Sequence, residues 1–151
     1  MIYRQKVIIK RISIDKVIDA FHDINFVKFL ISFQPVKIVH WVGIKNGLIA
    51  ELKFWFIKWN SIKVEHQKYE KTNKKLYFVD RGIGLPLGLN HWKHEHIVEK
   101  MGENIIIKDR LDFLHDSIFI GYILYPILVI PIFLRKALYP IYFYINKSRE
   151  K

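Results

Sequence analysis

The chain has 151 residues, a length that suits one domain with a substantial core. It has no cysteine, which excludes disulfides, thiolate metal ligands and a cysteine nucleophile. Hydrophobic residues make up 51% and aromatic residues 15%, so a large core, a ligand or a membrane must cover the apolar excess. The formal net charge is +11, but the lysines form no dense basic run, and we expect no specific nucleic-acid partner.

The first part of the chain predicts one strand and two short helices. Residues 2–12 read as a strand, and Ser13 then offers an N-cap. The apolar residues that follow have the spacing of a buried helix face: Ile14, Val17, Ile18 and Phe21. Asn25 is the expected cap of a second helix, whose apolar residues are Phe26, Phe29, Leu30 and Phe33. Pro35 ends this helix, because the residue before a proline avoids the helical region.

After Pro35 the apolar period changes to two, which is typical of strands. Six strands are predicted, at 36–42, 48–58, 61–70, 76–80, 91–100 and 105–114. Asn46-Gly47 marks one hairpin, and a glycine- and proline-rich loop is expected at 81–90. The short connections imply an antiparallel meander.

The strand at 91–100 carries the most unusual side chains. Because successive side chains point to opposite faces of a strand, its aromatic and imidazole residues share one face: Trp92, His94, His96 and Val98. The other face is mostly charged and should meet water: Lys93, Glu95, Ile97 and Glu99. A sheet face with a tryptophan and two histidines indicates a lined cavity rather than an aliphatic core.

The C-terminal segment, residues 117–145, is apolar and helical in pattern. From Ser117 to Leu134 there are 18 residues without a charge, followed by Arg135 and Lys136. This length reaches that of a membrane span, but Pro126 and Pro131 interrupt it. Three interpretations remain open: a helix that packs on the sheet and closes a cavity, a membrane-surface element, or a true span.

Several motifs together resemble the START/Bet v 1-like superfamily, in its bacterial SRPBCC (polyketide cyclase/dehydrase and lipid transport) branch. The matching residues are Phe21-His22 with Asn25, Phe78-Val79-Asp80, Gly84-Leu85-Pro86, Trp92-Lys93-His94-Glu95-His96 and Asp109. The resemblance implies an α+β helix-grip fold, in which a curved seven-stranded antiparallel sheet surrounds a C-terminal helix and two short helices follow the first strand. Members bind apolar molecules in a cavity between sheet and helix, and some are cyclases or dehydratases.

We therefore interpret residues 1–151 as a single ligand-binding domain for a hydrophobic, lipid- or polyketide-like small molecule. The expected ligand-binding residues are Trp92, His94, His96, Asp109, Trp55, Phe78 and Pro86. No catalytic residue, metal or cofactor is assigned. The alternatives are a cyclase- or dehydratase-like enzyme that uses the cavity histidines, and a membrane-associated protein that uses residues 118–134.

Other roles for the histidines also stay open. They could hydrogen-bond within the cavity wall, polarise a ligand, or form an acid–base pair with Asp109. A metal site would need a third ligand beside His94 and His96, for which Asp109, His40 and His66 are the candidates. The N-terminus has no apolar stretch of the signal-peptide type, so a cytoplasmic location, with a membrane surface as a second partner, is expected.

Overall fold

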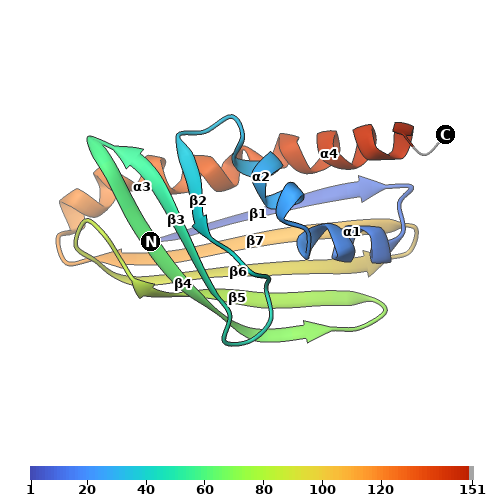
Figure 1. The fold of residues 1–151 in the computed structure, drawn as a ribbon, viewed down its shortest axis with the longest axis horizontal. Helices are drawn as coiled ribbons and strands as arrows, with labels where there is room; N and C mark the ends of the chain where they lie inside the picture. The colour runs from blue at the N-terminus through green and yellow to red at the C-terminus, as the bar shows by residue number, and fades with distance from the viewer. Residues whose placement is uncertain (150–151) are drawn as a thin grey trace.

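The computed structural model describes the backbone of residues 1–149 and the side chains of residues 1–146. Its elements, in chain order, are β1 (Ile2–Lys10), α1 (Ile14–Phe21), α2 (Ile24–Ile31), β2 (Val36–His40), β3 (Ile49–Phe56), β4 (Lys58–Lys71), β5 (Lys75–Gly84), β6 (Leu89–Met101), β7 (Asn104–His115), α3 (Ile118–Phe133) and α4 (Arg135–Arg149). The seven strands form one antiparallel sheet in the order β1-β7-β6-β5-β4-β3-β2. Figure 1 shows α3 and α4 running in line across one face of this curved sheet. The predicted helix-grip fold is confirmed.

Two apolar clusters join the helices to the sheet. One lies around α1, α2 and α4, with Val17, Phe26, Val98 and Tyr139 among its most buried members. The other lies under α3, where Leu124, Leu128 and Ile132 pack on Phe113 of β7. The inner face of the sheet is thus covered along its length by the helices, and the space between them positions the site described below.

The N-terminal helices form as predicted, but α2 differs at both ends. It ends at Ile31, so Phe33, predicted on its apolar face, lies beyond it and is 75% exposed. Ser13 caps α1, accepting a hydrogen bond from the backbone N–H of Lys16. The cap of α2 is Asp23, not Asn25: the Asp23 carboxylate accepts a hydrogen bond of 2.8 Å from the Asn25 backbone N–H. A carboxylate at this position accepts a hydrogen bond from a backbone N–H that has no partner within the helix, and its charge is stabilised by the positive end of the helix dipole. The helix therefore begins two residues earlier than predicted.

The loop before β6 is shorter than predicted. Strand β5 continues to Gly84, so only residues 85–88 connect it to β6. The connection closes through two residues with left-handed backbone angles, Leu87 (φ 59°) and Gly88 (φ 74°). A pair of left-handed residues matches the twist of two adjoining strands, and glycine adopts that conformation without strain.

Candidate functional site

A cavity of about 110 Å³ lies between the inner face of the sheet and the C-terminal helices. Most of its wall is apolar and comes from β2, β3, β4 and α3, with Trp92 of β6 at one side. Four polar residues also line it: Gln34, Asp80, His94 and Arg135. Two larger grooves, of about 730 and 630 Å³, lie beside α4 and hold none of these four residues. The polar groups therefore converge on the small inner cavity.

Four neighbouring strands bring histidines and carboxylates together behind this cavity. The register pairs His66 of β4 with Asp80 of β5, Asp80 with His94 of β6, and His96 of β6 with Asp109 of β7. All of these side chains are on the inner face because each strand places alternate residues there. The result is a continuous buried cluster, which we call the His–Asp cluster: His66, Asp80, His94, His96 and Asp109.

Asp109 is the centre of the cluster and its side chain is fully buried. Its carboxylate accepts hydrogen bonds from Gln5 Nε2 (2.9 Å) and His94 Nε2 (3.1 Å). From α4, the hydroxyl of Tyr139 donates to it at 3.2 Å and Arg135 Nη1 at 3.4 Å. Asp109 therefore ties β1, β6 and α4 together.

Asp80 forms the second acceptor of the cluster. Its two carboxylate oxygens accept separate hydrogen bonds, one of 2.8 Å from His66 Nδ1 and one of 3.0 Å from His96 Nε2. The ring of His96 lies between the two carboxylates, with its Nδ1 3.4 Å from Asp109 Oδ1. Phe78 stacks on the other side of this ring at 4.4 Å between centroids.

The protonation states follow from this arrangement. Burial opposes ionisation of Asp80, but the charge of His96 and the hydrogen bonds from His66 and His96 outweigh it and hold its pKa far below the usual range. The pKa of Asp109 is also held far below its usual range: burial opposes ionisation, but the hydrogen bond from His94, the nearby ring of His96 and the charge of Arg135 outweigh it. Burial alone would lower the pKa of His96, yet the two carboxylates raise it. Two anions, Asp80 and Asp109, thus face the imidazole of His96, whose pKa they raise, and the guanidinium of Arg135.

The side chain of His94 is the neutral member of the His–Asp cluster at neutral pH. Burial, together with repulsion from His96, lowers its pKa to about 4. Because an ionised carboxylate only accepts hydrogen bonds, the Nε2 that contacts Asp109 must carry the proton. The Nδ1 of His94 then has a free lone pair, 4.0 Å from Asp80 Oδ2. A neutral imidazole that lines a cavity in this state is a hydrogen-bond acceptor for a ligand.

Three of these residues also have the composition of a metal site. One ligand atom each of Asp80, His94 and His96 lies within 4.8 Å of the others, and two histidines with one carboxylate can hold a transition metal. Asp80 takes the place that Asp109, His40 or His66 was expected to fill; His40 is exposed on β2. A metal bound through His96 Nε2 would replace the hydrogen bond of 3.0 Å between that atom and Asp80, whereas His96 Nδ1 makes no hydrogen bond within the described residues.

The structure places the predicted site residues in three different surroundings. Trp92 and His94 line the cavity, whereas His96, Asp109 and Phe78 are buried behind it. Trp55 does not line the cavity: its side chain is 53% exposed on the outer face, because strand alternation turns Phe54 inward instead. Pro86 lies half-buried in the β5–β6 loop and is also absent from the cavity wall. Glu95, expected in water, is nearly buried under Tyr77, Lys93 and Arg110.

Sequence reasoning missed the contribution of the helices to the site. Gln34 follows α2, while Arg135 and Tyr139 begin α4. The sequence pattern identifies Arg135 only as a charge that flanks an apolar segment. The signal available in the sequence is a cation placed directly after 18 uncharged residues. A buried cation needs an anion, and Asp109 has only apolar neighbours from its own strand on the inner face of β7.

No protein-family model matches the chain, and no curated protein sequence matches it. Several solved structures are similar to the chain. The chain has the helix-grip fold of START/Bet v 1-like (SRPBCC) proteins. Norcoclaurine synthase from Thalictrum flavum, in complex with dopamine and hydroxybenzaldehyde, has a TM-score of 0.62 at 14% identity over 91% of this chain and 83% of that one. The Aha1 dimer from Colwellia psychrerythraea has a TM-score of 0.57 at 17% identity, covering 91% and 96%. A hypothetical protein from Helicobacter pylori has a TM-score of 0.60 at 17% identity, covering 76% and 70%.

Proposed function

We propose that the protein binds a small, mostly apolar molecule with one uncharged polar group in the cavity beneath α3. The observation that carries the proposal concerns two of the four buried side-chain atoms that have no hydrogen-bond partner among the described residues; the other two are His66 Nε2 and His96 Nδ1. Gln34 Oε1 and Arg135 Nε are buried and make no hydrogen bond within the described residues, although both residues line the cavity. An unsatisfied buried polar atom costs about 1–3 kcal/mol, so a ligand that bonds to both would recover part of that cost.

The two atoms match a hydroxyl group. Gln34 is held by its amide nitrogen, which donates to the Leu30 carbonyl at 2.7 Å, so its oxygen is left as an acceptor. Arg135 Nε is a donor. A hydroxyl can donate to the first and accept from the second. A neutral group also suits the site, because Arg135 is already paired with Asp109 at 3.4 Å and the Asp80 carboxylate lines the same cavity.

The size of the cavity favours a single ring. An engineered apolar cavity of about 150 Å³ binds benzene, and the cavity here is about 110 Å³. A lipid- or polyketide-sized ligand would need α3 to move outward. The synthase of the same fold was solved with two small aromatic molecules, which supports a ring-sized ligand for this chain as well.

An acid–base enzyme in the same cavity is the second candidate, favoured by the lone pair on His94 Nδ1. A general base works best when its pKa is near the working pH, and the pKa of His94 is lowered to about 4. Binding therefore has the stronger support. An enzyme of this kind would have a rate that falls with protonation of His94.

Calorimetric titration with p-cresol, toluene and benzoate tests the proposal. We expect p-cresol to bind about ten-fold more tightly than toluene, because only p-cresol satisfies Gln34 and Arg135. Benzoate should bind more weakly than p-cresol, because its charge would meet the Asp80 carboxylate in the cavity wall. Gln34→Leu should remove the preference for p-cresol. Gln67→Leu, the same change at a half-buried glutamine of β4 that does not line the cavity, should leave the preference for p-cresol intact. Equal affinities for p-cresol and toluene in the wild-type protein would refute the hydroxyl-binding role.

A further inference from the structure

Helix α3 is apolar on every side, including the side that faces away from the protein. Its inner residues, Leu124, Leu128 and Ile132, pack on the sheet. Its outer residues are exposed: Ile118, Phe119, Tyr122, Ile123, Ile130 and Phe133, and we call this set the α3 outer face. Phe119 and Tyr122 are 71% and 68% exposed. A helix in water normally has a polar outer side, so an all-apolar helix needs a cover that the described chain does not provide.

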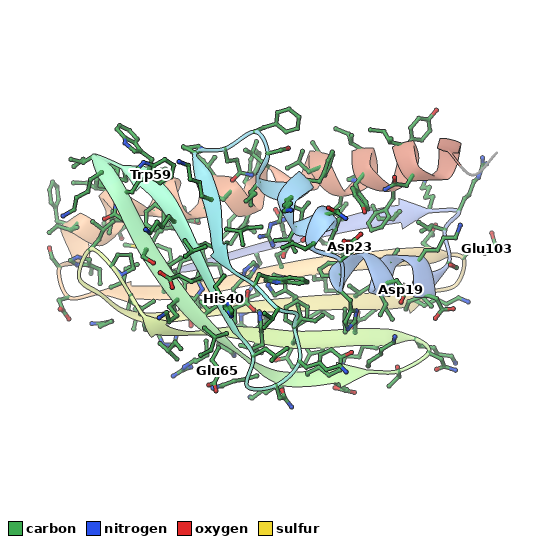
Figure 2. All side chains as sticks on the ribbon, viewed as in Figure 1. Asp19, Asp23, His40, Trp59, Glu65 and Glu103 are labelled. Atoms are coloured by element: carbon green, nitrogen blue, oxygen red, sulfur yellow. The ribbon has the colours of Figure 1, made fainter. Side chains whose placement is uncertain are left out.

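The tip of the β3–β4 hairpin extends this apolar surface. Phe54 and Phe56 pack against the cluster beneath α3, which places the end of the hairpin beside that helix. The tip itself exposes Trp55, Ile57 and Trp59, with Ile57 79% exposed. In Figure 2, Trp59 stands at the same edge of the molecule along which α3 and α4 run. Exposed tryptophans and tyrosines are typical of the interface between a membrane and water.

The charged residues within the two segments that form this surface are all basic. No acidic residue occurs from Ile118 to Asn146 or from Leu52 to Val64. Two lysines lie directly over exposed aromatic rings: Lys136 Nζ is 5.0 Å from the Phe133 ring and Lys37 Nζ is 4.3 Å from the Trp59 ring. Basic groups at the rim of an apolar patch complement anionic lipid headgroups, and the net charge of +11 adds to the attraction.

We propose that the α3 outer face and the β3–β4 tip dock flat on the surface of an anionic lipid bilayer. The segment Ile118–Asn146 is long and apolar enough to cross a membrane by length and composition, but the contacts argue for lying on it. A span would strip Leu124, Leu128 and Ile132 from the sheet and would separate Arg135 and Tyr139 from Asp109. Flat docking keeps all of these contacts and buries only the exposed residues.

Vesicle flotation tests this docking with purified protein. The wild-type protein should float with phosphatidylcholine vesicles that contain about one third phosphatidylserine at low salt, and binding should weaken at high salt or with phosphatidylcholine alone. Phe119→Ser with Tyr122→Ser should weaken binding at least about ten-fold, because two buried aromatic contacts are lost. Lys136→Gln should weaken binding to the anionic vesicles about five-fold and leave the residual binding to neutral vesicles unchanged.

The matched control is Ile83→Ser with Leu114→Ser, two residues that are each 51% exposed on the outer face of the sheet. This variant should float like the wild type. The docking proposal is overturned if the wild-type protein does not float with anionic vesicles, or if both double variants float equally well. A concentration-dependent dimer in sedimentation, abolished by the Phe119 and Tyr122 changes in a protein that does not float, would assign the α3 outer face to a second copy instead. None of these results depends on p-cresol binding, so the two proposals can fail separately.

Discussion

Replacing the central carboxylate of the His–Asp cluster should destabilise the whole fold. Asp109→Asn keeps the shape of the side chain but removes its charge, while His96 and Arg135 remain buried beside it. Breaking a buried ion pair from one side costs about 3–5 kcal/mol. Since a domain of this kind has a total stability of about 5–15 kcal/mol, the loss should be a large fraction of it. Urea unfolding followed by tryptophan fluorescence measures the change.

Asp112→Asn is the matched control, three residues further along the same strand. Asp112 is on the outer face and half-buried, and among the described residues its ionisable partners are the N-terminal amine at 3.9 Å and His91 at 3.6 Å. Exposed pairs of this kind contribute about 0–1 kcal/mol. If the free energy of unfolding falls equally in the two variants, or by less than about 1 kcal/mol in Asp109→Asn, the central role of Asp109 is refuted.

Further predictions concern the histidines and two backbone positions. The pKa of His94 is about 4 in the folded protein and near 6.5 in the unfolded chain, so between these pH values only the unfolded chain binds a proton at this residue. The free energy of unfolding should therefore fall by about 3 kcal/mol as the pH drops from 6.5 to 4. In urea titrations at several pH values, His94→Leu should reduce this dependence on pH. Because the pKa of His96 is raised in the folded protein, its contribution to the free energy of unfolding should be fully present below pH 6.5. This contribution should be lost as the pH rises through the pKa that His96 has in the folded protein. Pro126→Ala should raise the free energy of unfolding by about 1–3 kcal/mol, since it restores a donor inside α3; an unchanged value would argue against a regular helix there. Gly88→Ala should lower the melting temperature, at a cost of about 1–2 kcal/mol, because the new Cβ would meet His115 Nε2 at 2.9 Å in a left-handed turn; an unaltered melting temperature would show that the turn can change conformation.

Much of the fold could be predicted because its signals are local. Alternation along β6 correctly assigned His94, His96 and Val98 to the inner face, and the spacing of apolar residues located α1. The same alternation would have rejected Trp55, because its neighbour Phe54 has the inward position of β3. The prediction for Trp55 rests on its residue type alone, and the face of β3 on which it lies keeps it out of the cavity wall.

The site itself depends on contacts between distant parts of the chain. The hydrogen bonds to Asp109 come from Gln5, 104 positions away, and from Tyr139, 30 positions away. No periodicity reports such a pairing, since it is set by how α4 lies across the sheet. The break between α3 and α4 at Leu134, which brings Arg135 against Asp109, is likewise a product of packing.

A crystal structure of the protein grown with p-cresol would test the central claim most directly. We expect the ring to lie in the cavity beneath α3, beside Trp92, with its hydroxyl between Gln34 Oε1 and Arg135 Nε. A ring bound instead in the groove between β1 and α4, or a cavity left unchanged while p-cresol binds elsewhere, would contradict it.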